Sequence, residues 1–348
     1  MSGASSDPTS LHVAVLHGGP SSEHDISVVT SRGVLAALRA RGHRADAVWV
    51  DRNGRWHLGG GETDSGVAQG AGLDLPAALG ALVRGGYDVC FLGFHGTFGE
   101  DGRVQAALEL AGLRFTGSGP LASAVAMDKV MTRRVFRATG LPVADGIELV
   151  SAELATAEAR AAVAADAVAT VGLPAVVKVV AGGSSVGVEI AKDLADTEAA
   201  LDRLRTLWPT LLIERFVGGT ELTCGVLDGP DGPTALPCVE IAPRGERFFD
   251  YETKYDPSLV DEIVPARIPA AAEAALRSHA LAAHRVLGCR GVSRTDAILD
   301  RDGALWLLET NTLPGLTPAS LLPKAAAAAG LPYADLLERI IANALADG

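Results

Sequence analysis

Apolar and polar positions in the first third of the chain repeat an order of strand, glycine turn and helix. A strand at residues 12–17 (HVAVLH) is followed by helical periodicity that starts near Ile26, and Gly42 is its stop signal. Further elements of the same kind are strands at 45–50 and 87–96 and a helix at 104–110. Because alternating strands and helices favour parallel pairing, we predict a parallel, helix-covered sheet over about the first 118 residues.

In the rest of the chain, strands and helices are mixed at short separations along the sequence, and some strands form hairpins. From residue 119 the pattern predicts a helix at 120–138, a strand at 143–149, a helix at 152–168, a hairpin at 174–190, a helix at 196–207 and a strand at 211–216. Strands at 220–227 and 234–241, an irregular stretch at 244–261, a helix at 270–287, a hairpin at 292–310 and a helix at 333–346 follow. The pattern is typical of α+β domains. We therefore predict three domains, at residues 1–118, 119–217 and 218–348.

Composition and charge narrow the possible partners. The 348 residues are 48% hydrophobic and carry a net charge of −12, which disfavours nucleic-acid and anionic-membrane partners because those require a cationic surface. No apolar run reaches the ~20 residues of a membrane span, and the start resembles no signal peptide. Four widely spaced cysteines indicate free thiols in a reducing cytoplasm. A small-molecule role in the cytoplasm is favoured.

A glycine-rich stretch at 174–190, PAVVKVVAGGSSVGVEI, is either a plain hairpin turn or a phosphate-binding loop. Its lysine, Lys178, precedes the glycines, and the second flanking segment is a strand. Both features differ from the usual phosphate loop, in which the lysine follows the last glycine and a helix begins. The residues alone leave the two interpretations open.

The predicted hairpin at 292–310 brings polar side chains to one face. If Asp300 and Gly303 close the turn, facing residue numbers sum to 603, so Arg294 lies opposite Glu309. Asp296 and Glu309 are then diagonal neighbours, and Asn311 shares their face. Two carboxylates and an amide oxygen suit a hard cation such as Mg²⁺. The alternative is a surface salt bridge of Arg294 with Asp296 or Glu309.

Other polar residues lie at chain positions where ligands often bind. Glu23 starts a helix directly after a strand, in a segment whose Ser22 and Asp25 spacing is typical of helix capping. His95 follows another strand, where a structural donor is the common role. The segment ETNTLPG after Glu309 either ends a strand or directs N–H groups at an oxyanion. The segment YETKY at 251–255 is a solvated loop or a lid.

Taken in chain order, these segments resemble one family. The order LHGGPSSEHDIS, FHGTFGEDGRVQAALELAGLRFTGSG, MDK, VVKVVAGGSSVGV, IERFVGGTEL, YETKY, GVSRTDAILD and LETNTLPGLTPASLLP is similar to D-alanine–D-alanine ligase, of the ATP-grasp superfold. The similarity covers nearly all of residues 12–346. It implies a cytoplasmic, ATP-dependent ligase that forms D-alanyl-D-alanine for peptidoglycan through an acyl phosphate, with two Mg²⁺ ions (Mn²⁺ as substitute) and a homodimer.

The resemblance also implies roles for single residues. The metal ligands would be Asp296, Glu309 and Asn311, and the stabilisers of the reacting groups Arg294 and Gly315. The first substrate would contact Glu23 and His95, with Glu23 linked through Ser184 to Tyr255, and the second would contact Ser320 and Leu321. The nucleotide would contact Lys129, Lys178, Ser184, Ser185, Glu214, Arg215, Val217, Glu221 and Lys254. In this interpretation the glycine-rich loop covers the triphosphate, and Lys178 reaches in from the strand.

The sequence departs from the family pattern at a few positions. Arg215 stands where a lysine is frequent beside adenine, Phe249 where a tyrosine is frequent, and AGGSSVG lacks a charged residue before its GSS. These differences concern nucleotide affinity and lid closure, and leave the metal ligands intact. The competing interpretation is a paralogous ligase that joins D-Ala to D-Ser, D-lactate or another amino acid in resistance or natural-product synthesis. Tyr255 favours the dipeptide-forming type.

Overall fold

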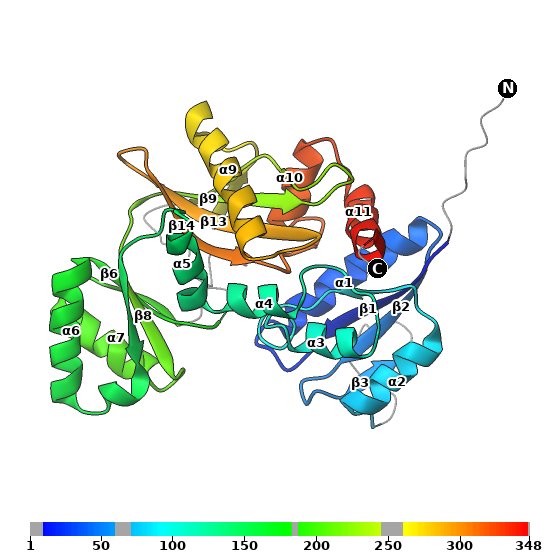
Figure 1. Ribbon diagram of the computed structural model, residues 1–348, viewed down its shortest axis with the longest axis horizontal. Coiled ribbons are helices and arrows are strands. Elements are labelled where there is room, and N and C mark those ends of the chain that lie inside the picture. Colours follow the sequence, from blue (N-terminus) through cyan, green and yellow to red (C-terminus); the bar gives the residue numbers. More distant parts are fainter. Residues whose placement is uncertain (1–9, 60–70, 183–186, 245–259, 347–348) are drawn as a thin grey trace.

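The computed structural model describes residues 10–59, 71–182, 187–244 and 260–346, which contain three separate β-sheets (Figure 1). The first sheet has the order β3-β2-β1-β4, with β1 (His12–Gly18) parallel to both β2 (Arg44–Val50) and β4 (Val89–Leu92). The short edge strand β3 (Trp56–Leu58) is antiparallel to β2. The predicted parallel sheet is therefore confirmed, with one antiparallel edge.

Helices cover both faces of the first sheet. Alternate residues of β1 point to opposite faces, so Val13 and Val15 pack with α1 (His24–Ala40) and α11 (Tyr333–Ala346). Ala14 and Leu16 pack on the other face with α2 (Leu75–Gly85) and α3 (Arg103–Leu110). The helix α11 comes from the far end of the chain and lies beside α1 (Figure 1). The first sheet is thus joined to the C-terminal part of the chain through an apolar core.

The middle sheet is antiparallel and has the order β5-β8-β6-β7. Its strands are β5 (Gly146–Val150), β6 (Ala175–Val179), β7 (Val188–Ala191) and β8 (Thr210–Arg215). The helices α6 (Ala157–Val171) and α7 (Leu194–Leu204) pack on it around Leu154, Val177 and Ile213 (Figure 1). The predicted hairpin at 174–190 is confirmed as β6 and β7.

The third sheet is antiparallel as well and holds the longest strands. Its order is β12-β11-β9-β13-β14, with β10 paired to β9. These strands are β9 (Gly219–Leu227), β10 (Thr234–Ala235), β11 (Val239–Pro243), β12 (Val260–Ile263), β13 (Val292–Asp300) and β14 (Leu305–Asn311). One face packs on α9 (Ala270–Val286), and the other reaches the apolar cluster shared with α10 (Leu321–Ala328) and α11. The α/β and α+β fold class is confirmed.

Several predictions of individual helices and strands were wrong. The helix predicted at 120–138 is two helices, α4 (Pro120–Met127) and α5 (Lys129–Ala138), because the Asp128 carboxylate caps the second by accepting from Met131 N–H at 2.9 Å. The helix predicted at 152–168 begins as a 3₁₀ turn, Ser151–Leu154, before Thr156 caps α6. The pattern also missed β3, α2 and α10. Of the stretch predicted as irregular, 244–261, residues 245–259 lie outside the described residues. Its end was wrong, because Val260 and Asp261 belong to β12.

None of the described helices combines the length and the apolar character that crossing a membrane requires.

Candidate active site

The polar residues that the predicted hairpin brings together face one another across β13 and β14 of the third sheet. The register of this strand pair differs from the predicted one. Leu299 pairs with Leu305, so the turn is one residue longer than assumed and the predicted sum of 603 is wrong. A β-bulge at Leu308 then shifts the pairing again, so that Asp296 lies directly opposite Glu309 and Arg294 opposite Asn311. The two shifts compensate, and the four side chains lie on one face as predicted.

Arg294 and Asp296 form a buried ion pair on this face. The guanidinium donates from Nε and Nη2 to the two carboxylate oxygens at 2.9 and 2.8 Å, and the side chains are 8% and 14% exposed. Burial by itself lowers the pKa of Arg294, but Asp296, Glu309 and Glu100 together raise it above its usual range. Arg294 therefore stays a fixed positive charge, and the pair is no surface salt bridge.

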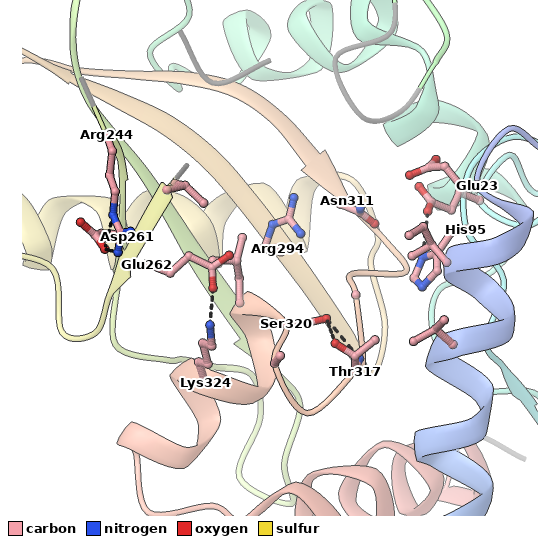
Figure 2. A pocket seen from close by; sticks show the side chains of 17 residues that line it. Glu23, His95, Arg244, Asp261, Glu262, Arg294, Asn311, Thr317, Ser320 and Lys324 are labelled. Carbon is pink, nitrogen blue, oxygen red and sulfur yellow. Dashed lines mark hydrogen bonds and ion pairs between the residues drawn. The ribbon is translucent and has the colours of Figure 1, made fainter. Parts of the chain in front are cut away.

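A cavity of about 440 Å³ opens in front of Arg294, and we call it the Arg294 cavity. Figure 2 shows how its walls come from distant parts of the chain: Glu23 from the start of α1, His95 from the segment after β4, Arg294 and Asn311 from the third sheet, and Ser320 from the start of α10. Gly315 and Leu321 also line it. The residues predicted to contact the two substrates thus lie around one space.

Glu23 enters the Arg294 cavity from the start of α1. It is the N-cap residue of that helix without a capping side-chain bond, so the Ser22 and Asp25 capping prediction was wrong. Ser21 instead binds the turn together: its Oγ accepts from Glu23 N–H at 3.1 Å and donates to the His95 carbonyl at 2.8 Å. Gly96 leaves space for Glu23, because a Cβ there would lie 2.7 Å from Glu23 Oε2.

His95 lies beside Glu23 at the Arg294 cavity and is held by a hydrogen bond and an ion pair (Figure 2). Its Nε2 lies 2.9 Å from Thr30 Oγ1, and its Nδ1 lies 3.6 Å from Glu100 Oε1, which also accepts from Gly96 N–H at 2.9 Å. Glu100 lines the same cavity and was missed, although it stands five residues after His95 in the quoted segment. The signal that could have identified it is an acidic residue close after His95 in the segment FHGTFGEDG.

The segment after β14 lines the lower wall of the Arg294 cavity. Ser320 Oγ accepts from Thr317 N–H at 3.1 Å and lies 2.7 Å from Thr317 Oγ1 (Figure 2). A Cβ at Gly315 would come within 2.9 Å of Ser320 Oγ, so only glycine fits this turn without displacement. Gly315 N–H has no acceptor among the residues that the structure describes. It is therefore available to bind an oxyanion.

A second cavity of about 140 Å³ lies between the middle and third sheets, and we call it the Lys178 cavity. Of the predicted nucleotide and metal residues, those that line it are Lys129, Lys178, Glu214, Arg215, Val217, Glu221, Asp296 and Glu309. Both lysines contact carboxylates here: Lys129 Nζ lies 3.0 Å from Glu309 Oε2, and Lys178 pairs with Glu214. Lys129 Nζ also donates to the Gly182 carbonyl at 2.9 Å, which ties α5 to the glycine-rich loop.

Arg215, the departure from the family pattern, has a defined position. Its guanidinium carbon lies 4.5 Å above the ring centroid of Trp306, and Trp306 Nε1 donates to Asp300 Oδ2 at 2.8 Å. The side chain thus stacks on an indole at the edge of the Lys178 cavity. Phe249, Lys254, Tyr255, Ser184 and Ser185 lie outside the described residues.

The two cavities meet at a small space of about 40 Å³ lined by Glu23, Lys129, Glu309 and Asn311. Glu309 and Asn311 offer carboxylate and amide oxygens there, and Asp296 lies opposite Glu309 in the wall of the Lys178 cavity. Such oxygens are the donors that hard divalent cations prefer. No group of three His, Cys, Asp or Glu side chains suited to a metal occurs among the described residues, so a metal at this junction needs Asn311 or ligand oxygens as further donors. The chemistry of this donor set fits Mg²⁺ or Mn²⁺.

Comparison with known proteins agrees with this geometry. The family models described as D-ala D-ala ligase N-terminus and D-ala D-ala ligase C-terminus match residues 12–118 and 135–342. The D-alanine–D-alanine ligase of Anaeromyxobacter sp. (strain Fw109-5) is 42% identical over 336 residues, covering 97% of both chains. That of Synechococcus sp. (strain JA-3-3Ab) is 37% identical over 335 residues, covering 96% of this chain and 94% of the relative.

A solved structure extends the comparison to three dimensions. The D-alanine–D-alanine ligase from Coxiella burnetii superposes with a TM-score of 0.78 at 27% identity, covering 98% of this chain and 95% of the other. The ATP-grasp fold expected from the motifs is thereby confirmed. The family models and these relatives span all three sheets and both cavities, so the chain belongs to the D-alanine–D-alanine ligase family.

Proposed function

We propose that this protein is an ATP-dependent ligase that joins two D-alanine molecules into D-alanyl-D-alanine, for peptidoglycan precursor synthesis in the cytoplasm. The observation that carries the proposal is the junction of the two cavities. A carboxylate bound in the Arg294 cavity and a phosphate bound in the Lys178 cavity meet beside Glu309 and Asn311. Phosphoryl transfer requires this kind of approach, because it depends chiefly on positioning and on charge neutralisation.

The first D-alanine binds between the start of α1 and Arg294. Glu23 receives its ammonium group, His95 completes the pocket, and the carboxylate points toward the junction. A carboxylate oxygen then attacks the γ-phosphorus of ATP, the bond from that phosphorus to the β-γ bridging oxygen breaks, and ADP leaves. The product of this step is an acyl phosphate, whose negative charge Arg294 offsets.

The second D-alanine binds at the start of α10, where Ser320 and Leu321 hold its carboxylate. Its neutral amine attacks the acyl carbonyl carbon, and the bond from that carbon to the phosphate-bearing oxygen breaks. Inorganic phosphate leaves with that oxygen and takes up the proton that the nitrogen loses. Arg294 and the N–H of Gly315 stabilise the oxyanion that forms on the carbonyl oxygen. Tyr255 and Ser184, which complete the network with Glu23 in this proposal, lie outside the described residues.

ATP binds in the Lys178 cavity. Lys129 and Lys178 contact its phosphates, the segment from Glu214 to Val217 contacts adenine, and Glu221 contacts the ribose. Ser185 and Lys254, which lie outside the described residues, are proposed to contact the nucleotide as well. Two Mg²⁺ ions, or Mn²⁺, would be held by Asp296, Glu309 and Asn311 and would neutralise charge between the β- and γ-phosphates when bound.

The proposal includes the domain limits and the assembly. The domains are residues 1–118, 119–217 and 218–348, each containing one of the three sheets, and the protein is a homodimer without nucleic-acid or membrane partners. The net charge of −12 supports the exclusion of anionic partners.

A product assay tests the proposed substrates. The protein is incubated with ATP, Mg²⁺ and D-alanine, alone or paired with D-serine or D-lactate, and products are identified by mass spectrometry. We expect ADP, phosphate and D-alanyl-D-alanine from D-alanine alone. Background phosphate release with D-alanine alone, together with product from D-alanine plus D-lactate or D-serine, would contradict the proposal and identify a paralogous ligase.

A further inference from the structure

Three charged side chains form a buried cluster beside the Lys178 cavity: Lys178 and Glu214 line the cavity, and Arg133 contacts Glu214. Glu214, on β8, contacts Arg133 through Oε1 and Lys178 through Oε2. The three side chains are 7–9% exposed, and Arg133 Nη2 also donates to the Ala144 carbonyl at 2.6 Å. Both carboxylate oxygens of Glu214 therefore have a cationic partner, whereas Lys178 is the only member of the cluster with a proposed role toward phosphate.

The helix α5 and the space at Gly146 position Arg133 beside Glu214. Arg133 stands one helical turn after Lys129 on α5, so both side chains lie on the same face of that helix. Gly146 leaves room for it, because a Cβ there would lie 2.9 Å from Arg133 Nη2. The neighbouring Arg134 faces outward and pairs with Glu148 at the surface. Of the two arginines, Arg133 is therefore the one that contacts Glu214, a residue of the cavity wall.

The charges in the cluster do not balance. One carboxylate is shared by two cations, which leaves a net charge of +1 on three side chains that are at most 9% exposed. A buried excess cation is costly unless an anion joins it, so the cluster is suited to a negatively charged ligand. A lysine is also the member whose flexible stem can reach a new partner, whereas Arg133 is fixed by its bond to Ala144.

We propose that Arg133 is a positioning residue that keeps Glu214 neutralised and in place while Lys178 turns from Glu214 to the polyphosphate of the nucleotide. This inference rests on the proposed function, which places ATP in the Lys178 cavity. Without Arg133, Lys178 is the sole counter-ion of a buried carboxylate among the described residues. Its turn toward phosphate then leaves Glu214 unpaired, and phosphate binding weakens.

Binding of tripolyphosphate, measured by calorimetry at fixed Mg²⁺, tests this role without depending on turnover. Arg133→Met should weaken tripolyphosphate binding at least about tenfold, because the buried carboxylate loses its second partner. Arg133→Met combined with Glu214→Gln should restore binding to within about threefold of the wild type, because no charge is then left unpaired. Arg134→Met, the adjacent surface arginine, is the matched control and should bind like the wild type.

Two results would overturn the inference. One is an Arg133→Met variant that binds tripolyphosphate like Arg134→Met, and the other is a double variant as weak as Arg133→Met, which indicates a merely structural role. If Arg133→Met does not fold, Glu214→Gln alone decides: it should bind tripolyphosphate at least as tightly as the wild type, because Lys178 is released from its partner, and weaker binding contradicts the inference.

The same titrations separate this inference from the proposed function. Wild-type protein that binds tripolyphosphate and ATP but forms no dipeptide contradicts the proposed function and leaves the role of Arg133 standing. Wild-type protein that forms the dipeptide while Arg133→Met retains full tripolyphosphate affinity contradicts only the role of Arg133. A wild type that binds no tripolyphosphate overturns the inference outright.

Discussion

Asp296 and Glu309 lie directly opposite each other across the pair of β13 and β14, because Leu308 is bulged out of the register. Without the bulge, the turn that pairs Leu299 with Leu305 would place Glu309 on the opposite face of the sheet from Asp296. One extra residue in β14 thus decides whether the two carboxylates face the same cavity. We expect both to act on the metal ions that accompany ATP.

Replacing Glu309 tests the metal assignment. Glu309→Gln keeps the size of the side chain but removes the charge that faces Lys129 and the proposed metal site, so turnover should fall by more than about 100-fold. The thermal unfolding midpoint should change little, since Glu309 is 35% exposed. Steady-state rates at several Mg²⁺ concentrations measure the effect, with Glu148→Gln at the surface as control. Near-normal turnover would refute the role.

The hairpin shows what the sequence could and could not predict. Alternation along each strand and the glycine-containing turn predicted the pairing of β13 and β14 and the shared face of Arg294, Asp296, Glu309 and Asn311. The register was wrong, because the Asp300 carboxylate accepts from the N–H groups of Asp302 and Ala304 and so stabilises a longer turn. Bulges leave no signal in an apolar–polar pattern, so the correct face came from two errors that cancel.

Gly96 should be specifically required for the first substrate. Its φ is +75°, and an alanine Cβ would lie 2.4 Å from Ser21 Oγ and 2.7 Å from Glu23 Oε2, so Gly96→Ala should displace Glu23, which we propose receives the ammonium. We expect KM for the first D-alanine to rise about tenfold or more. Gly112 has φ +70° and open space around it, so Gly112→Ala is the matched control.

Both glycine variants should lose about 1–2 kcal/mol of unfolding free energy through the positive φ, but only Gly96→Ala should change the kinetics. Denaturant unfolding and initial rates separate the two effects. An equal KM in the two variants would show that Glu23 does not contact the first substrate.

Ser320 should act on the second substrate alone. Ser320→Ala removes the acceptor of Thr317 N–H and the hydroxyl at the start of α10, so the KM of the weaker-binding D-alanine should rise about tenfold. The KM of the tighter-binding D-alanine should stay within about twofold. Two-site analysis of the substrate dependence measures both constants, with Ser151→Ala in the 3₁₀ turn after β5 as control. Parallel changes in both constants would contradict the assignment.

The ion-pair partners of the cationic residues could not be predicted from the sequence. Lys129 and Lys178 were expected at phosphate, yet their side chains contact Glu309 and Glu214, residues distant from them along the chain. Arg133 was missed because one more arginine on an amphipathic helix resembles a solvated face. Its burial follows from the packing of α5 between two sheets, which no local pattern encodes. Motif order located the cavities, and tertiary packing determined the ion pairs.

His17 should make the protein less stable in mild acid. Burial at the end of β1 lowers the pKa of His17 to about 4, although its bond to the Val15 carbonyl opposes this. The unfolded chain binds a proton near pH 6.5 and the folded chain does not, so unfolding free energy falls as pH drops from about 6.5 to 4. The contribution is about 3 kcal/mol.

Denaturant unfolding of the wild type and His17→Gln across this pH range measures the contribution. The variant should show the shallower dependence on pH, whatever its stability at neutral pH. Parallel curves for the two proteins would show that His17 is not the titrating group.

The most direct test of the central claim follows one oxygen atom. D-alanine labelled with ¹⁸O in both carboxylate oxygens is incubated with the protein, ATP and Mg²⁺, and the products are analysed by mass spectrometry. Ligation through an acyl phosphate predicts ADP, D-alanyl-D-alanine and inorganic phosphate carrying one ¹⁸O atom. Three results would contradict the account: unlabelled phosphate, AMP with pyrophosphate in place of ADP, or labelled D-alanine that is recovered unreacted with no dipeptide formed.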